Sequence, residues 1–286
     1  MIHRFILHND QIREASDKAL SAGQVGLLSG WGVFSTLRVI DGAIFAWERH
    51  WARVAKDAAL FHVELPADPE ALRRRLLDLI EANRAPSCTL RLAIVRNGGG
   101  MWAGAPTGCA SDVIALTADT KYWGGGVKLA WAEQGRHAAS PFAGAKILSW
   151  ALNLRLLEMA QDRGFDEVIL LNEHGQVAEC TSANLFIANG DQVLTPPLSS
   201  GCLPGITREV ILTELHVPGV RICEKELTQA DVESADEIFI TSTTRELLRV
   251  LEIEGRKVGR GDRVRPALQE AFTLYEERYI AERRKA

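Results

Sequence analysis

"DEVILLNEHGQVAECTSANLFIANGDQVLTP", residues 166–196, contains two β-hairpins in direct succession. Apolar runs typical of strands flank the turn at Asn172 to Gly175 and again the turn at Asn189 to Asp191. Strands joined by such short turns run antiparallel, whereas parallel strands need a long crossover. The stretch therefore favours an α+β fold with hairpin-rich sheets over a doubly wound parallel sheet.

Strands and helices are also expected on either side of this stretch. "GVFSTLRVIDGAIFAW" predicts a hairpin at Asp41-Gly42, and Asp68 followed by Pro69 predicts the start of a helix. A further helix follows residue 150 and ends at Gly164, and the glycine run 124–126 indicates a connection. We expect a small α/β domain at 1–117, an interdomain connection at 118–137 and a large domain at 138–286.

Composition argues against several kinds of partner. The 286 residues carry a net charge of −4 and a pI near 6.0, with no basic face for nucleic acid. No apolar run approaches the ~20 residues that cross a bilayer, and no signal-peptide pattern opens the chain, so we expect a cytoplasmic protein. Seven scattered histidines and five cysteines without a CxxC pair argue against a metal site and a disulfide framework.

The segment "SPFAGAKILSW", residues 140–150, places Lys146 among small and apolar residues. Lys146 is either an ordinary surface charge or an amine held in a dry pocket. Burial disfavours the charged form of lysine and lowers its pKa, which makes the amine available for covalent chemistry. Lys146 is therefore a candidate catalytic residue.

Glu179 is the candidate acid of the second hairpin strand. With period two it shares a face with Val177 and Thr181, while Ala178 and Cys180 occupy the other face. Both faces are largely apolar or small, so we expect a buried carboxylate that needs a cationic or donor partner. An edge-strand glutamate in water is the alternative.

Three further features are suited to an anion. "LPGITR" predicts a helix that opens at Gly205, where free backbone N–H groups and the helix dipole favour negative charge. "TSTTRE" supplies hydroxyls, Thr243 and Thr244 among them, directly after an apolar strand, and Arg53 lies on a predicted helix. An amine, an acid and phosphate donors together are what a pyridoxal phosphate site requires.

Residues Gly32 to Gly255 resemble the class IV aminotransferases, the fold type IV group of pyridoxal phosphate enzymes. The resemblance lies in six motifs in the order of that family: "GVFSTLR", "RHWAR", "SPFAGAK", "GFDEVILLNEHGQVAECTSANLF", "LPGITR" and "TSTTRE". It implies a two-domain fold with a barrel-like sheet in the large domain, and a homodimer. It also implies that Lys146 forms the internal aldimine and shuttles the substrate proton, that Glu179 pairs with the pyridinium nitrogen and Leu203 packs on the ring, and that the phosphate contacts fall on Arg53, Ile206, Thr207 and Thr243.

The motifs do not all point to one of the three branches that matter in that family, which are the branched-chain aminotransferases, the D-amino-acid aminotransferases and the aminodeoxychorismate lyases. Branched-chain aminotransferases typically carry a tyrosine and a glutamate where this chain has Ser29 and Ser35, and only Arg38 remains. Thr36 matches a threonine of the aminodeoxychorismate lyases, whereas "TSTTRE" resembles the aminotransferases. The other candidate substrate residues are Arg96 and Arg136, because arginine suits carboxylates, and Trp150 and Thr244.

Two enzymatic functions and one non-catalytic function follow. The first is an aminotransferase that exchanges an amino group between an amino acid, the branched-chain class among the candidates, and a 2-oxo acid. The second is an aminodeoxychorismate lyase that releases pyruvate and 4-aminobenzoate. The third is a phosphate-ligand or interaction module without catalysis, against which the intact Lys146 and Glu179 argue.

Overall fold

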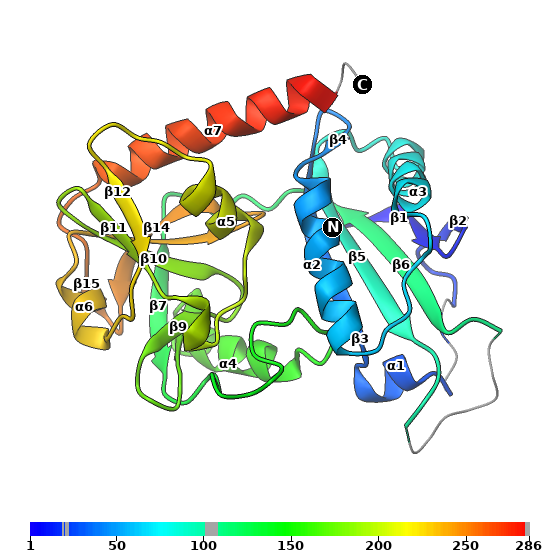
Figure 1. Ribbon diagram of the computed structural model, residues 1–286, viewed down its shortest axis with the longest axis horizontal. Coiled ribbons are helices and arrows are strands. Elements are labelled where there is room, and N and C mark those ends of the chain that lie inside the picture. The colour runs from blue at the N-terminus through cyan, green and yellow to red at the C-terminus, as the bar shows by residue number, and fades with distance from the viewer. Residues whose placement is uncertain (19, 21–22, 101–107, 284–286) are drawn as a thin grey trace. The chain divides into compact units, whose positions relative to one another are not determined.

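The computed structural model describes residues 1–18, 20, 23–100 and 108–283. By chain contacts these residues form two compact units (Figure 1), which are described separately. Unit 1 contains Met1–Lys121, the five residues Lys146–Trp150 and the chain from Tyr279; unit 2 contains Tyr122–Ala145 and Ala151–Arg278. Because the units are not contiguous in the chain, the contiguous domains expected at 1–117 and 138–286 remain a prediction.

Unit 1 contains an antiparallel sheet of six strands in the order β2-β1-β6-β5-β3-β4. The predicted turn joins β3 to β4, and both Asp41 and Gly42 have positive φ (49° and 81°), as a tight hairpin turn requires. The strands are β1 (Ile2–His8), β2 (Gln11–Glu14), β3 (Gly32–Ile40), β4 (Ala43–Ile44), β5 (Cys88–Arg96) and β6 (Ser111–Ala118).

Two long helices cover one face of the unit 1 sheet (Figure 1). Helix α2 (Trp47–Leu60) and helix α3 (Pro69–Ala82) bury apolar side chains against Leu37, Val39 and neighbours on β3 and β5. The Asp68 carboxylate accepts the N–H groups of residues 70 and 71, which confirms the predicted start of α3. A short helix α1 (Val25–Ser29) precedes β3.

Unit 2 contains a nine-stranded sheet whose main path runs β12-β11-β10-β13-β14-β7-β8-β9, with β15 paired to β14. Both predicted hairpins are present, as β8–β9 and β10–β11, and the α+β class is confirmed. The strands are β7 (Val127–Ala132), β8 (Glu167–Leu171), β9 (Val177–Cys180), β10 (Asn184–Asn189), β11 (Gln192–Thr195), β12 (Arg221–Glu224), β13 (Glu237–Ser242), β14 (Glu246–Ile253) and β15 (Arg256–Lys257).

The helices of unit 2 lie around this sheet. Helix α4 (Ala151–Gln161) contacts β7 and β8, and helix α5 (Ile206–Thr213) contacts β12 and β13. A 3₁₀ turn, η1 (Leu198–Ser200), precedes α5, and the short helix α6 (Gln229–Ser234) opens with a capping box at Thr228. The β8, β10 and β13 strands supply much of the buried apolar core.

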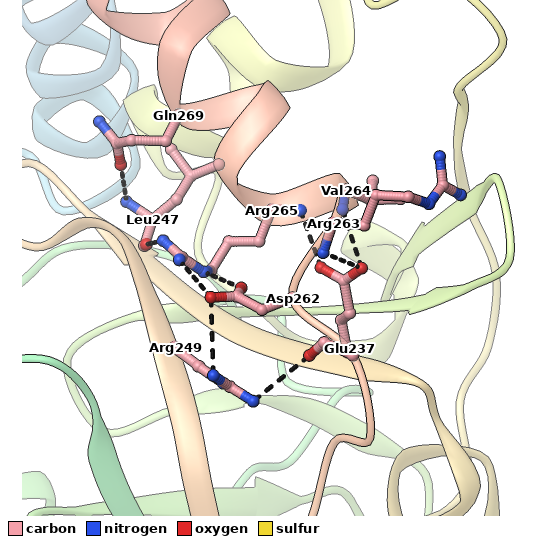
Figure 2. Close-up of polar contacts among 9 residues, drawn as sticks. Glu237, Leu247, Arg249, Asp262, Arg263, Val264, Arg265 and Gln269 are labelled. Atoms are coloured by element: carbon pink, nitrogen blue, oxygen red, sulfur yellow. Dashed lines mark hydrogen bonds and ion pairs between the residues drawn. The ribbon is translucent and has the colours of Figure 1, made fainter.

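The last helix, α7 (Val264–Arg283), begins at a buried carboxylate. Glu237 on β13 accepts the backbone N–H groups of Arg263, Val264 and Arg265, each at 2.8 Å (Figure 2). These are N–H groups that a helix start leaves without an intrahelical partner. Gln269 on α7 also accepts the N–H of Leu247, so two side chains fix the helix to the β13–β14 hairpin.

No helix among the described residues combines the length and the apolar character that a membrane span needs.

Candidate functional site

The Lys146 backbone is fixed from two sides within unit 1. Its carbonyl accepts the N–H of Phe34 at 3.0 Å, and Leu148 N–H donates to Gly32 O at 2.9 Å, so the segment pairs with the beginning of β3. Lys146 N–H donates to Asp57 Oδ2 on α2 at 3.1 Å. Glycine is favoured at position 32, because a Cβ there would lie 2.4 Å from the Ile94 carbonyl oxygen on β5 and 2.6 Å from a Leu148 methyl carbon. Strand pairing therefore fixes the position of the Lys146 backbone, from which the side chain extends.

The Lys146 side chain extends over the ring of Phe34. Its Nζ lies 4.6 Å from the ring centroid, and Lys146 is half-buried. The Arg91 guanidinium lies 3.9 Å from the same centroid, and the Trp150 ring meets Phe34 edge-on at 6.0 Å. An amine and a guanidinium thus share one aromatic ring, which attracts cations through its π-electrons.

Arg91 is a residue that sequence reasoning missed. It lies opposite Thr36 in the β3–β5 register, one strand away from Phe34 on the same face. Burial lowers the pKa of Arg91, although a guanidinium stays charged in proteins. Among the described residues it has no acidic partner. Because a half-buried cation needs an anion, Arg91 is suited to a substrate carboxylate.

A second polar group of unit 1 lies between β3 and α2. Ser35 Oγ accepts a hydrogen bond from Arg53 Nη2 at 3.0 Å and lies 2.8 Å from His50 Nδ1. Burial, and then the charges of Arg53 and Lys146, lower the pKa of His50 well below its usual range. His50 is therefore a neutral imidazole at neutral pH, and Arg53 is the cation of this group.

The predicted acid lies in unit 2 and is buried as expected, with a side chain that is 6% exposed. Oε1 of Glu179 accepts from Arg136 Nε at 2.9 Å and also lies 2.9 Å from Arg136 Nη2. Oε2 accepts the N–H of Leu203 at 3.1 Å. Arg136 Nη1 also donates to Asn153 Oδ1 at 3.2 Å. The side chain expected to bind a substrate carboxylate is thus engaged by Glu179, and it compensates a buried negative charge.

Helix α5 begins as the sequence predicts. Gly205 is its N-cap, in extended conformation, and no side chain caps the N–H groups that follow. Glycine leaves room for Asn184 here, since a Cβ would lie 2.0 Å from Asn184 Oδ1 and the amide would have to move. Ile206 and Thr207 follow at the start of the helix and are both buried. Uncapped N–H groups and the helix dipole at this end favour an anion.

The "TSTTRE" motif forms the turn from β13 to β14. Thr243 and Thr244 lie in the turn and are half-buried. Thr241, at the end of β13, is buried, and its Oγ1 has no hydrogen-bond partner among the described residues. Because this hydroxyl is enclosed by the protein, the accessible hydroxyls of the turn are those of the half-buried Thr243 and Thr244.

The remaining predicted residues belong to the unit 1 sheet. Thr36 and Arg38 alternate with buried residues on β3 and are half-buried. Arg96 at the end of β5 lies over the Trp31 ring at 4.1 Å and donates to Gly98 O, so local contacts engage it. The predicted site residues therefore divide between the units: Thr36, Arg38, Arg53, Arg96, Lys146 and Trp150 belong to unit 1, and Arg136, Glu179, Leu203, Ile206, Thr207, Thr243 and Thr244 belong to unit 2.

Comparison with known proteins agrees with the motifs. Residues 32–253 match the family described as amino-transferase class IV. The chain is 30% identical over 260 residues to a D-alanine aminotransferase of Bacillus licheniformis, with 90% of each chain covered. It is also 30% identical over 256 residues to a branched-chain-amino-acid aminotransferase of Pseudomonas aeruginosa, with 85% and 83% covered.

A solved structure leads to the same family. The branched-chain amino acid aminotransferase of Escherichia coli superposes with a TM-score of 0.87 at 25% identity, covering 96% of this chain and 95% of the other. These relatives are named as aminotransferases, which does not favour the lyase alternative. The chain belongs to the class IV aminotransferases and is a transaminase.

Proposed function

We propose that the chain uses pyridoxal phosphate to exchange an amino group between an amino acid and a 2-oxo acid. The observation that carries the proposal is the pair of cationic side chains over Phe34, the amine of Lys146 and the guanidinium of Arg91. An amine is what an aldehyde cofactor needs, and an arginine suits the carboxylate of an amino or 2-oxo acid. Arg91 lies on β5, which pairs with β3, and Lys146 precedes the residue that forms the Val33–Ile147 bridge.

The residues of this chain fit pyridoxal phosphate. Oε2 of Glu179 accepts one hydrogen bond among the described residues, so this buried carboxylate can accept another from a ring N–H. The α5 N-terminus has no side-chain cap, so its backbone N–H groups are suited to a phosphate. When bound, the cofactor supplies a protonated ring that withdraws electrons from the substrate.

The proposed roles follow the family motifs. Lys146 holds the cofactor through Nζ and moves the substrate proton at that atom. Glu179 accepts from the ring nitrogen and keeps it protonated, and Arg136 orients the Glu179 carboxylate rather than binding substrate. The residues proposed to pack on the ring or to hold the phosphate are Leu203, Arg53, Ile206, Thr207 and Thr243.

On the substrate side, we assign a carboxylate to Arg91 and place Thr36 beside it, because the two residues are register partners on β3 and β5. Amino acids and 2-oxo acids both carry an α-carboxylate, so this assignment of Arg91 applies to both partners of the exchange, and we take 2-oxoglutarate as the 2-oxo acid to test. Arg38, Trp150 and Thr244 stay predicted substrate contacts, whereas Arg96 stacks on Trp31 and donates to Gly98 O, so we propose that it does not bind the substrate.

The test is a donor screen. Purified protein with pyridoxal phosphate is supplied with D- and L-amino acids, including branched-chain ones, and 2-oxoglutarate, and the glutamate formed is measured by chromatography. We expect glutamate with at least one donor. Release of pyruvate and 4-aminobenzoate from aminodeoxychorismate, with no glutamate from any donor, would contradict the proposal and favour a lyase.

The substrate role of Arg91 has its own matched control on the same strand. Arg91→Met should raise KM for 2-oxoglutarate about 10- to 100-fold with a smaller change in kcat, because a bidentate carboxylate contact is lost. Arg96→Met removes an arginine that also stacks on an aromatic ring, and its KM should stay within about twofold of wild type. Equal KM values for the two variants would show that Arg91 does not bind the carboxylate.

We further propose a homodimer, as the family resemblance implies. The α4 helix exposes Leu152 (80%) and Met159 (49%), which are seven residues apart and share one helix face, and exposed apolar side chains on one face suit a subunit contact. Sedimentation equilibrium should give twice the 31.5 kDa chain mass, and Leu152→Lys should shift the population toward the monomer. A wild-type monomer at micromolar concentration would contradict this. The cytoplasmic location stays a prediction.

A further inference from the structure

Unit 2 contains a second buried acid and arginine, Glu167 and Arg245, to which none of the roles above applies. The Glu167 side chain is fully buried and that of Arg245 is 6% exposed. Arg245 Nη2 donates to Glu167 Oε2 at 3.1 Å. The hydroxyls of Thr181 and Ser182 also donate to the Glu167 carboxylate. Burial lowers the pKa of Arg245, and the charge of Glu167 opposes that change.

The Arg245 side chain connects separate parts of the unit. Nη1 donates to Ser182 O at 3.2 Å, which lies in the bend that follows β9, and Nη2 reaches Glu167 at the start of β8. The guanidinium carbon lies 3.9 Å from the centroid of the Trp123 ring, before β7. Backbone N–H of Arg245 donates to Ser242 O at 3.2 Å. The residue thus ties the β13–β14 turn to the bend after β9.

A continuous series of contacts joins this turn to the acid Glu179. Thr181, which donates to Glu167, accepts Asn153 Nδ2 at its carbonyl at 2.7 Å. Asn153 Oδ1 accepts from Arg136, and Arg136 donates to Glu179. The turn that carries Thr243 and the carboxylate of Glu179 therefore share one hydrogen-bonded network, whose two ends are the Arg245–Glu167 and Arg136–Glu179 pairs.

We propose that Arg245 is a positioning residue for the cofactor: its fork to Glu167 and Ser182 O sets the Thr243 turn relative to the strand that carries Glu179. The inference rests on the proposed function, since it assigns Thr243 and Glu179 to the same ligand. A planar guanidinium with fixed N–H directions can hold two acceptors at once, which a lysine ammonium does less well. Arg245 itself is not proposed to contact the cofactor or the substrate.

A purely structural ion pair would give a different pattern, and a double variant separates the two. Arg245→Met leaves the Glu167 charge buried without its cation, so this variant should lose stability for that reason alone. Adding Glu167→Gln removes the uncompensated charge, and its amide oxygen can still accept from Thr181 or Ser182. The R245M/E167Q chain should therefore recover most of the lost melting temperature while the fork stays absent.

A control arginine lies on β14. Arg249 forms an ion pair with Asp262 at 3.6 Å, near the start of α7 (Figure 2). Arg249→Met removes an arginine that lies four residues after Arg245. Arg249 contacts Asp262 and the carbonyl of Gly261 just before α7, and not the Thr243 turn. It should lower the melting temperature without changing the affinity for pyridoxal phosphate.

The experiment measures two quantities on the full chain: the melting temperature, and the dissociation constant of pyridoxal phosphate from its absorbance during equilibrium dialysis. We expect R245M/E167Q to melt near wild type and to bind the cofactor about tenfold more weakly, with R245K between the two and R249M binding like wild type. Wild-type affinity in R245M/E167Q would overturn the inference and leave the proposed function intact. A wild-type chain that takes up no pyridoxal phosphate would overturn the proposed function itself, and the cofactor role of Arg245 with it.

Discussion

Glu167 and Glu179 lie on neighbouring strands of one sheet, both buried and both paired with an arginine, yet their surroundings differ. Glu167 accepts from Val168 N–H, two hydroxyls and Arg245, which fills about the four acceptor positions of a carboxylate. Oε2 of Glu179 accepts a single bond from the described residues, and its arginine is 23% exposed against 6% for Arg245.

The difference shows how one sheet uses the same residue type in two ways. A carboxylate whose acceptor positions are filled by the protein holds the chain together and has nothing left for a ligand. A carboxylate fixed by an arginine on one oxygen, with capacity on the other, can accept a further hydrogen bond from a bound group. In the proposed site, the occupancy of the carboxylate oxygens, rather than burial alone, distinguishes Glu179 from Glu167.

The largest expected effect is the loss of folding stability when Glu167, whose oxygens accept hydrogen bonds from four groups, is replaced. Glu167→Gln leaves the Arg245 charge buried without a carboxylate, and it should lower the free energy of unfolding by about 3–5 kcal/mol. Urea denaturation followed by circular dichroism measures this loss. A loss below about 1 kcal/mol would mean that the Glu167–Arg245 pair does not differ from an ordinary surface pair.

The second effect is on activity and comes from the other carboxylate. Glu179→Gln should lower kcat about 10²- to 10³-fold, because an amide cannot keep a ring nitrogen protonated as a carboxylate does. Its unfolding free energy should change by only about 1 kcal/mol, since Arg136 is partly exposed and can be hydrated. Steady-state kinetics at saturating cofactor, beside the same urea titration, measures both. A larger loss of unfolding free energy in Glu179→Gln than in Glu167→Gln would contradict the difference proposed between the two acids.

The smallest effect concerns a third glutamate, in the turn between the two strands. The N–H groups of Ala139 and Ala138 lower the pKa of Glu173 to about 2, from an ordinary 4.5. A lowered folded pKa means that this carboxylate contributes stability above pH 4.5 and loses the contribution as the pH falls toward 2. Glu173→Gln should make the melting temperature less dependent on pH across that window. An unchanged pH profile would show that these two hydrogen bonds do not persist in solution.

Local patterns in the sequence were sufficient for several elements. The Asp41-Gly42 turn and the Asp68 cap are dictated by nearest neighbours, and both are present. The burial of Glu179 followed from the alternation along β9, because strand period and apolar neighbours fix the face. Local chemistry explains these successes, since no distant contact is needed to produce them.

Other features depend on pairings between distant residues. No local pattern identifies the partner of Arg91, and only the β3–β5 register brings it to the ring of Phe34. Arg136 meets Glu179 across a sequence separation of 43 residues, and Arg245 meets Glu167 across 78. A single sequence contains no signal for such partners, because tertiary packing selects them.

Lys146 is the case in which the pattern and the pairing both matter. Its apolar neighbours and the family motif identified the residue, whereas its attachment to β3 through Phe34 and Gly32 required the fold. The structure leaves Lys146 half-buried rather than enclosed. The reactivity of the Lys146 amine toward pyridoxal phosphate is therefore the property that most needs a direct test.

The most direct measurement is covalent mapping of that lysine. Protein incubated with pyridoxal phosphate is treated with borohydride, which makes a lysine–cofactor link permanent, and is then digested and sequenced by mass spectrometry. The account predicts one modified peptide, with a phosphopyridoxyl group on Lys146, and no such label in Lys146→Ala. A label on another lysine at equal yield, or none in the wild-type chain, would contradict it.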